Sequence, residues 1–179
     1  MGTDQDRFRS IRVGISACLL GTEVRYDGGH KRDDVIIEAL GRVVEWVPVC
    51  PEVEAGFGTP REPMNLVRTE GGLRLITVDT VRDVTEPFDA YAKGRVSQPA
   101  FEELSGYVLK KDSPSCGLES VKVYDARGIA EHSGRGRFAA ALVERFPGLP
   151  VDDESRLADP QVREQFLERV FAYARLKER

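Results

Sequence analysis

Residues 11–21 have the sequence Ile11-Arg12-Val13-Gly14-Ile15-Ser16-Ala17-Cys18-Leu19-Leu20-Gly21, an alternating apolar run that leads into a turn containing a cysteine. This alternation predicts a β-strand. Asp33-Asp34 can cap a helix that follows, and Trp46-Val47-Pro48-Val49 predicts a second strand. The apolar positions of the helix follow the helical period at Val35, Ile36, Ala39, Leu40, Val43 and Val44. A strand, a helix and a strand in this order predict a parallel βαβ unit.

The rest of the chain continues the alternation of strands and helices. Two short apolar runs around Gly71-Gly72 predict a hairpin. Further elements are predicted at 87–95, 99–104, 107–109, 121–124, 137–145 and from Pro160 onward. We therefore expect an α/β fold with a mainly parallel sheet, flanking helices in a three-layer, Rossmann-like arrangement, and a small hairpin insertion. We expect residues 1–10 to form a flexible tail and residues 11–179 to form a single domain.

The composition is that of an ordinary globular protein. The chain has 179 residues, of which 41% are hydrophobic and 31% charged, with a net charge of −4. That charge offers no basic footprint for a nucleic-acid polymer. No apolar run approaches the ~20 residues that span a bilayer, so we expect no membrane partner. Three cysteines are an odd number, and no apolar signal segment precedes the first strand, so a reducing cytoplasm fits better than a disulfide framework.

Each of the three cysteines lies in a short turn that directly follows a strand-like run. Cys18 ends the first run, Cys50 follows Val49, and Cys116 lies in a Ser/Pro-rich turn after Tyr107-Val108-Leu109. A single free cysteine is most often a small buried hydrophobic residue. In an open α/β sheet, however, ligands bind beyond the carboxyl ends of the strands, so three thiols placed there could converge.

Converging thiolates select zinc, copper(I) or iron–sulfur clusters. A structural zinc site prefers four ligands, and the chain has no C-x-x-C pair and only His30 and His132 as further candidates, both in turns where a loop histidine is expected. Three cysteines favour a [4Fe–4S] cluster with one open iron, to which a sulfur-containing substrate would bind. The alternatives are a non-catalytic iron–sulfur or zinc-binding module and a thiol redox protein.

Polar side chains tethered to the cysteines are candidates for proton transfer. Glu52 lies two residues after Cys50, and Ser113 and Ser115 lie within three residues of Cys116. Glu52 could instead cap a helix, and the two serines could only shape a turn. Asp112 is a second acid/base candidate or a turn former. Nearby cations could hold an anionic substrate or could simply be solvated: Lys31, Lys110 and Lys111.

Several motifs together resemble the thiouracil desulfidase family. They include residues 15–21 and 24–32, Pro48-Val49-Cys50-Pro51-Glu52, and Lys111-Asp112-Ser113-Pro114-Ser115-Cys116-Gly117. Shorter matches occur at 59–61, 136–139, 146–150 and 156–157, so the resemblance extends over about residues 11–175.

The resemblance implies a cytoplasmic enzyme that removes sulfur from thiolated nucleobases such as 2-thiouracil, giving the oxo base and sulfide. It implies a [4Fe–4S] cluster on Cys18, Cys50 and Cys116, with an open iron for the thiocarbonyl sulfur. In this scheme Glu52 would activate water, and Ser113 would orient the base or relay a proton. The partner is then a small thiolated pyrimidine.

Overall fold

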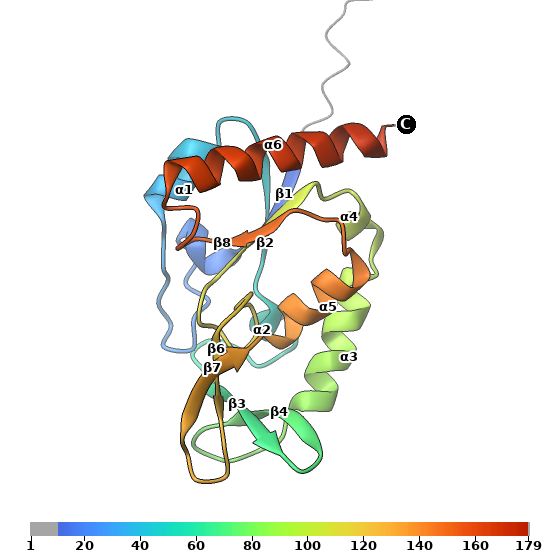
Figure 1. Ribbon diagram of the computed structural model, residues 1–179. Helices are drawn as coiled ribbons and strands as arrows, with labels where there is room; N and C mark the ends of the chain where they lie inside the picture. Colours follow the sequence, from blue (N-terminus) through green and yellow to red (C-terminus); the bar gives the residue numbers. More distant parts are fainter. Residues whose placement is uncertain (1–10, 179) are drawn as a thin grey trace, which may run out of the picture.

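The computed structural model describes residues 11–178 (Figure 1). The tail predicted at residues 1–10 lies outside them. In chain order the elements are β1 (Arg12–Ser16), the 3₁₀ turn η1 (Ala17–Leu20), α1 (Asp34–Leu40), β2 (Glu45–Val49), α2 (Pro51–Glu54), β3 (Met64–Thr69), β4 (Gly72–Thr77), α3 (Thr85–Val96), α4 (Pro99–Glu102), β5 (Gly106–Leu109), β6 (Val121–Tyr124), β7 (Ala130–Gly134), α5 (Arg137–Arg145), β8 (Val151–Asp153) and α6 (Pro160–Lys177).

The central sheet is fully parallel, with strand order β2-β1-β5-β8. The register pairs the last residues of the first two strands, Ser16 with Val49. It also pairs Ile15 with Val108 on the opposite side of β1. The carboxyl ends of β1, β2 and β5 therefore lie side by side at one edge, and the predicted βαβ unit is confirmed.

Helices cover both faces of this sheet, as the prediction of three layers requires. On one face Val13, Ile15 and Val108 pack with side chains of α1 and α6, among them Ile36 and Phe166. On the other face the core is formed with α3, α4 and α5. Its aromatic centre consists of Phe101, Tyr107 and Phe138, whose rings lie 5.9 to 6.4 Å apart between centroids. Within residues 11–178, no helix has both the length and the apolar character needed to cross a membrane.

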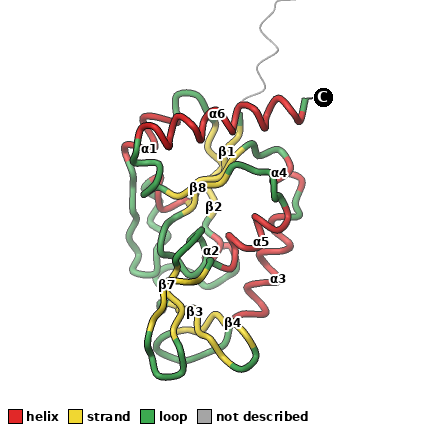
Figure 2. Tube along the Cα trace, in the orientation of Figure 1, coloured by secondary structure: helices red, strands yellow, loops and turns green. Residues whose placement is uncertain are grey.

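The predicted hairpin of β3 and β4 is present, but it is not an isolated insertion. It forms half of a second four-stranded sheet, with order β4-β3-β6-β7, in which β3 pairs with β6 in parallel. This sheet lies at the end of the molecule away from α6 (Figure 2). Leu66, Leu75 and Val123 from this sheet join the core that contains α3 and α5, so the hairpin packs on the same core as the central sheet.

One prediction made from periodicity needs correction, and two strands of the structure were not predicted. Helix α1 begins as expected, with the Asp33 carboxylate accepting a hydrogen bond of 3.0 Å from the Ile36 amide, but it ends at Leu40. Gly41 follows, and Val43 lies in the turn with 46% of its surface exposed. Strands β7 and β8 were not predicted, because Glu131-His132-Ser133 and Asp152-Asp153 lack the apolar character that marks a strand.

Replacement of Phe138 by Ala should destabilise the fold strongly. The ring is fully buried between Phe101 and Tyr107, so truncation removes transfer free energy and leaves a cavity. The expected loss is about 3–5 kcal/mol in the free energy of unfolding. Urea unfolding followed by circular dichroism measures it, with Leu176→Ala as control because Leu176 is 66% exposed. A loss below about 1 kcal/mol in Phe138→Ala would contradict the assigned core.

Candidate active site

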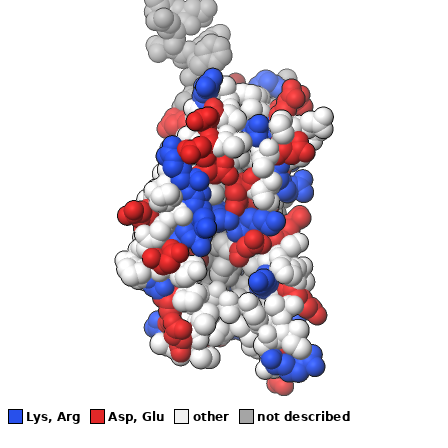
Figure 3. Space-filling view, turned by 90° about the vertical axis from the view of Figure 1, so that its left-hand side faces the viewer, with Lys and Arg blue, Asp and Glu red and all other residues white. Residues whose placement is uncertain are grey.

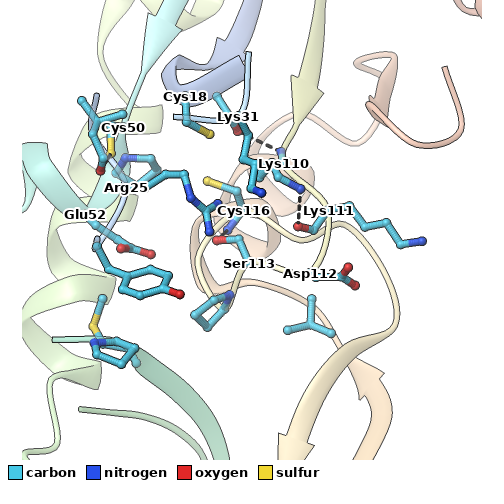
Figure 4. A pocket seen from close by; sticks show the side chains of 18 of the residues that line it. Cys18, Arg25, Lys31, Cys50, Glu52, Lys110, Lys111, Asp112, Ser113 and Cys116 are labelled. Carbon is cyan, nitrogen blue, oxygen red and sulfur yellow. Dashed lines mark hydrogen bonds between the residues drawn. The ribbon is translucent and has the colours of Figure 1, made fainter. Parts of the chain in front are cut away.

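The three cysteines line one cavity of about 430 Å³ at the carboxyl edge of the central sheet. Cys18 comes from η1, directly after β1, and Cys50 is the first residue after β2. Cys116 comes from the loop between β5 and β6. Figure 4 shows their side chains in the same pocket, arriving from three different segments of the chain. The convergence predicted from the strand ends is present.

The position of this cavity follows from the strand order. The connection from β1 to β2 contains α1, which packs on one face of the sheet. The later connection to β5, on the other side of β1, contains α3 and α4, which pack on the opposite face. The order of strands therefore reverses between β1 and β5. At such a switch point the connections diverge to opposite faces and leave a crevice, which is where α/β proteins bind ligands.

The donor set fits an iron–sulfur cluster. All three cysteines are free thiols, and Cys18 and Cys116 are buried. Burial raises the pKa of Cys18 to about 11, although Lys110 and Arg25 act in the opposite direction. Burial also raises the pKa of the Cys50 and Cys116 thiols. The close C-x-x-C pair that marks many thiol redox enzymes does not occur in the chain.

Among residues 11–178, no three His, Cys, Asp or Glu side chains are arranged to hold a single metal ion. A [4Fe–4S] cluster is a different kind of guest, because each of its cysteine ligands binds a separate iron. The histidines do not join the site: the Nδ1 of His30 accepts a hydrogen bond from the Arg32 amide, and His132 contacts the Ser120 carbonyl.

The loop that carries Cys116 is held by backbone contacts. The Oγ of Ser113 accepts hydrogen bonds from the amides of Ser115, at 3.2 Å, and Cys116, at 3.0 Å. The amides of Gly136 and Phe138, at the start of α5, donate to the carbonyls of Gly117 and Ser115 at 2.7 and 2.9 Å. A Cβ atom at Gly136 would lie 2.4 Å from the Ser115 carbonyl, so only glycine permits this approach.

Glu52, in α2, has both carboxylate oxygens engaged. Arg61 contacts Oε2 with its Nε at 2.6 Å and with Nη2 at 2.5 Å. The hydroxyl of Ser115, a fully buried residue, donates to Oε1. Both side chains of the ion pair are nearly buried, with 7% of Arg61 and 13% of Glu52 exposed. The sequence indicated Glu52 but not Arg61, because an arginine in a Gly/Pro-rich loop is usually solvated.

Positive side chains surround the cysteines. The Lys110 Nζ donates to a carboxylate oxygen of Glu154, and both side chains are less than one-fifth exposed. The guanidinium of Arg25 lies beside the cysteines, and its buried Nε has no hydrogen-bond acceptor among the described residues. Figure 3 shows Lys and Arg gathered across the middle of the face that includes the connection from β1 to α1. Of the predicted groups, Lys31, Lys110, Lys111 and Asp112 all line the cavity.

These features define a class of protein: a three-layer α/β protein with three free thiols in one pocket at the switch point of a parallel sheet. The sequence profile of the 2-thiouracil desulfurase family matches residues 13–154. Protein YbbK of Bacillus subtilis, described as uncharacterized, is 32% identical over 153 residues, which are 81% of this chain and 97% of YbbK.

Among solved structures, the [4Fe-4S]-dependent thiouracil desulfidase TudS is similar, with a TM-score of 0.67 and 33% sequence identity. The match covers 87% of this chain and 97% of TudS. The chain therefore belongs to the 2-thiouracil desulfurase family. The resemblance found in the sequence motifs is confirmed, and so is the predicted fold class.

Gly136→Ala should displace the Cys116 loop and weaken retention of the cluster. The new Cβ would clash with backbone atoms of Ser115 and Cys116, which cannot rotate away as a side chain could. We expect a stability loss of about 1–3 kcal/mol and a lower iron content after anaerobic reconstitution. The matched control is Gly94→Ala, where a Cβ meets nothing within 4 Å. Equal iron content in both variants would show that the contact does not hold the loop.

Proposed function

We propose that this chain is a [4Fe–4S]-dependent desulfidase that converts thiolated nucleobases such as 2-thiouracil to the oxo base. The reaction consumes one water, since C=S and H₂O give C=O and H₂S, and it needs neither oxidant nor reductant. The observation that carries the proposal is the convergence of three free cysteines on one pocket that also contains Glu52. Membership of the 2-thiouracil desulfurase family and the similarity to TudS support it.

In this proposal Cys18, Cys50 and Cys116 hold the cluster. When bound, the cluster supplies an iron without a cysteine ligand, which acts as a Lewis acid for the sulfur of the substrate. Three protein thiolates leave that fourth position open, as three protein ligands do at catalytic zinc sites. Lys110 and Arg25 lie where they favour the deprotonated form of Cys18, which a metal ligand must adopt.

We propose that Glu52 accepts the proton of the attacking water. A carboxylate offers about four lone-pair positions, and the contacts of Arg61 and Ser115 use three of them. The position that remains is on Oε1, where a water can donate its proton. Asp112 lines the same cavity and is the next candidate for this role.

Ser113 is assigned to orient the base or to pass a proton. Its Oγ accepts hydrogen bonds from two backbone amides, which fixes the oxygen at the cavity wall. Because the oxygen acts as acceptor in both contacts, its own hydroxyl proton can be donated to a polar atom of the substrate.

We further propose that the substrate is a small thiolated pyrimidine and that the reaction takes place in the cytoplasm. The cavity has room for a single base with its substituents, and apolar side chains such as Val49 and Met64 line part of it. A cluster on three otherwise free thiols is best preserved in a reducing compartment.

The direct test uses anaerobically reconstituted protein and 2-thiouracil. We expect uracil and sulfide in equal amounts, measured by chromatography and by a colorimetric sulfide assay. A panel that adds 4-thiouracil and the corresponding nucleosides and nucleotides identifies the preferred form. Cluster-loaded protein that releases no sulfide from any member of the panel would refute the proposed activity.

Replacing any one of Cys18, Cys50 or Cys116 by Ser should abolish cluster retention, because a hydroxyl is a far poorer ligand for iron than a thiolate. The measurements are the amounts of iron and acid-labile sulfide per chain and the visible absorption spectrum. Zinc gives no visible absorption, so the spectrum distinguishes an iron–sulfur cluster from bound zinc. A variant that keeps full iron content and activity would remove that cysteine from the site.

Glu52→Gln should keep the cluster and lower turnover by about 10²- to 10⁴-fold, the usual range for a general acid–base group. Ser113→Ala should lower it by a comparable or smaller factor. Glu54→Gln is the matched control, because that carboxylate contacts Tyr91 and Arg95 instead of lining the cavity. Wild-type turnover in cluster-loaded Glu52→Gln would show that the acid/base group lies elsewhere.

A further inference from the structure

The guanidinium of Arg61 is committed to contacts around the site. Its Nε and Nη2 contact Oε2 of Glu52, and Nη1 donates to the carbonyls of Val24, at 2.9 Å, and Gly58, at 2.8 Å. The Arg61 amide donates to the Tyr26 carbonyl at 2.9 Å. Such a set of short contacts around a side chain that is 7% exposed leaves it little freedom to move.

We propose that Arg61 is a positioning residue for Glu52, an inference that rests on the catalytic role proposed for Glu52. With two donors on Oε2, Arg61 fills both lone-pair positions of that oxygen. Ser115 takes one position on Oε1, so water has access to one defined position on one oxygen. Arg61 thereby determines which oxygen of Glu52 accepts the proton and in which direction it points.

Arg61 also connects this carboxylate to the wall of the pocket. The Val24 carbonyl accepts hydrogen bonds from Arg61 Nη1 and from the Cys50 thiol, at 3.7 Å. Val24 precedes Arg25 and Tyr26, which line the cavity. One side chain therefore keeps the pocket wall, the Cys50 segment and Glu52 in fixed relation.

A lysine cannot replace this arginine. Its single ammonium group is a point charge, whereas the planar guanidinium offers five donors in a fixed fork. Arg61→Lys preserves the positive charge but loses the two-point contact with Oε2 and the simultaneous reach to Val24 and Gly58. The substitution thus separates a requirement for charge from a requirement for geometry.

The experiment is a double-mutant cycle on reconstituted enzyme, with Arg61→Lys made in the wild type and in Glu52→Gln. In the wild type we expect kcat to fall by about 10- to 100-fold, the cost of a misplaced catalytic group, with KM changed by less than about threefold. Iron content and visible spectrum should stay unchanged. In the Glu52→Gln background the same substitution should change kcat by less than about twofold, because Arg61 then has no carboxylate to position.

Arg82→Lys is the matched control. The Arg82 side chain is 66% exposed and meets the Glu62 carboxylate only at 3.5 Å, so its kinetics should equal those of the wild type. Equal losses from Arg61→Lys in both backgrounds would overturn the inference, because Arg61 would then act independently of Glu52. Loss of iron in Arg61→Lys would also overturn it, by showing that Arg61 supports the cluster instead.

Thermal unfolding of the reconstituted proteins gives a readout that does not depend on turnover. If the two side chains act as a buried pair, the double variant Arg61→Gln/Glu52→Gln should be no less stable than the worse single variant, because neither charge is left unpaired. Additive losses in melting temperature would contradict the pairing.

If Glu52→Gln turns over like the wild type, the catalytic role proposed for Glu52 is wrong. If Glu52→Gln is impaired but Arg61→Lys lowers kcat equally in both backgrounds, only the role of Arg61 is wrong.

Discussion

Parallel pairing of β1 with β2 on one side and β5 on the other is the constraint on which the site depends. Parallel strands share a direction, so each chain segment leaves the sheet at the same edge. Because Ser16 pairs with Val49 and Ile15 with Val108, the three strands also end at nearly the same level. Three cysteines that are 32 and 66 residues apart in the sequence are thereby delivered to one cavity. A shift of any strand along its neighbour would separate them.

The same sheet makes loss of a proton from the three thiols unfavourable. A parallel sheet must be covered by helices on both faces, which buries the strand ends and the thiols that follow them. Burial disfavours thiolates, and it is the main reason that the pKa of all three cysteines is raised. The surrounding cations oppose this penalty for Cys18. A cluster on thiolates brings negative charge into the protein, and the nearby positive side chains stabilise that charge.

Around the thiols, charged side chains are held in pairs: Glu52 with Arg61 and Lys110 with Glu154. Buried charges of this kind are stable only when each has a partner and its remaining hydrogen-bonding positions are occupied. These pairs give fixed orientations to groups that would sample many rotamers on an exposed surface. The pocket therefore combines apolar lining residues with a few polar groups of defined orientation, the combination that gives small-molecule sites their specificity.

Much of the fold was accessible from local patterns. Apolar alternation predicted β1 and short apolar runs predicted β2 and β5, while the Asp33 cap and Pro160 marked helix starts. These signals depend on residues that are close in sequence. The end of α1, by contrast, was placed too late, because Val43 and Val44 continue the helical period beyond Gly41. Strands β7 and β8 were missed because they form through pairing with β6 and β5 and not through their own composition.

The sequence by itself determined the positions of the three cysteines after strands and the tethering of Glu52 to Cys50. Together with the other motifs between residues 11 and 175, these were enough to indicate the family. Only the tertiary structure decided which groups meet. Ser115 and Glu52 are 63 residues apart, and Lys110 and Glu154 are 44 apart. Such contacts depend on how the layers pack and on side-chain directions within a shared cavity, and no local pattern encodes them. The contact between Ser115 and Glu52 is therefore a property of the folded molecule.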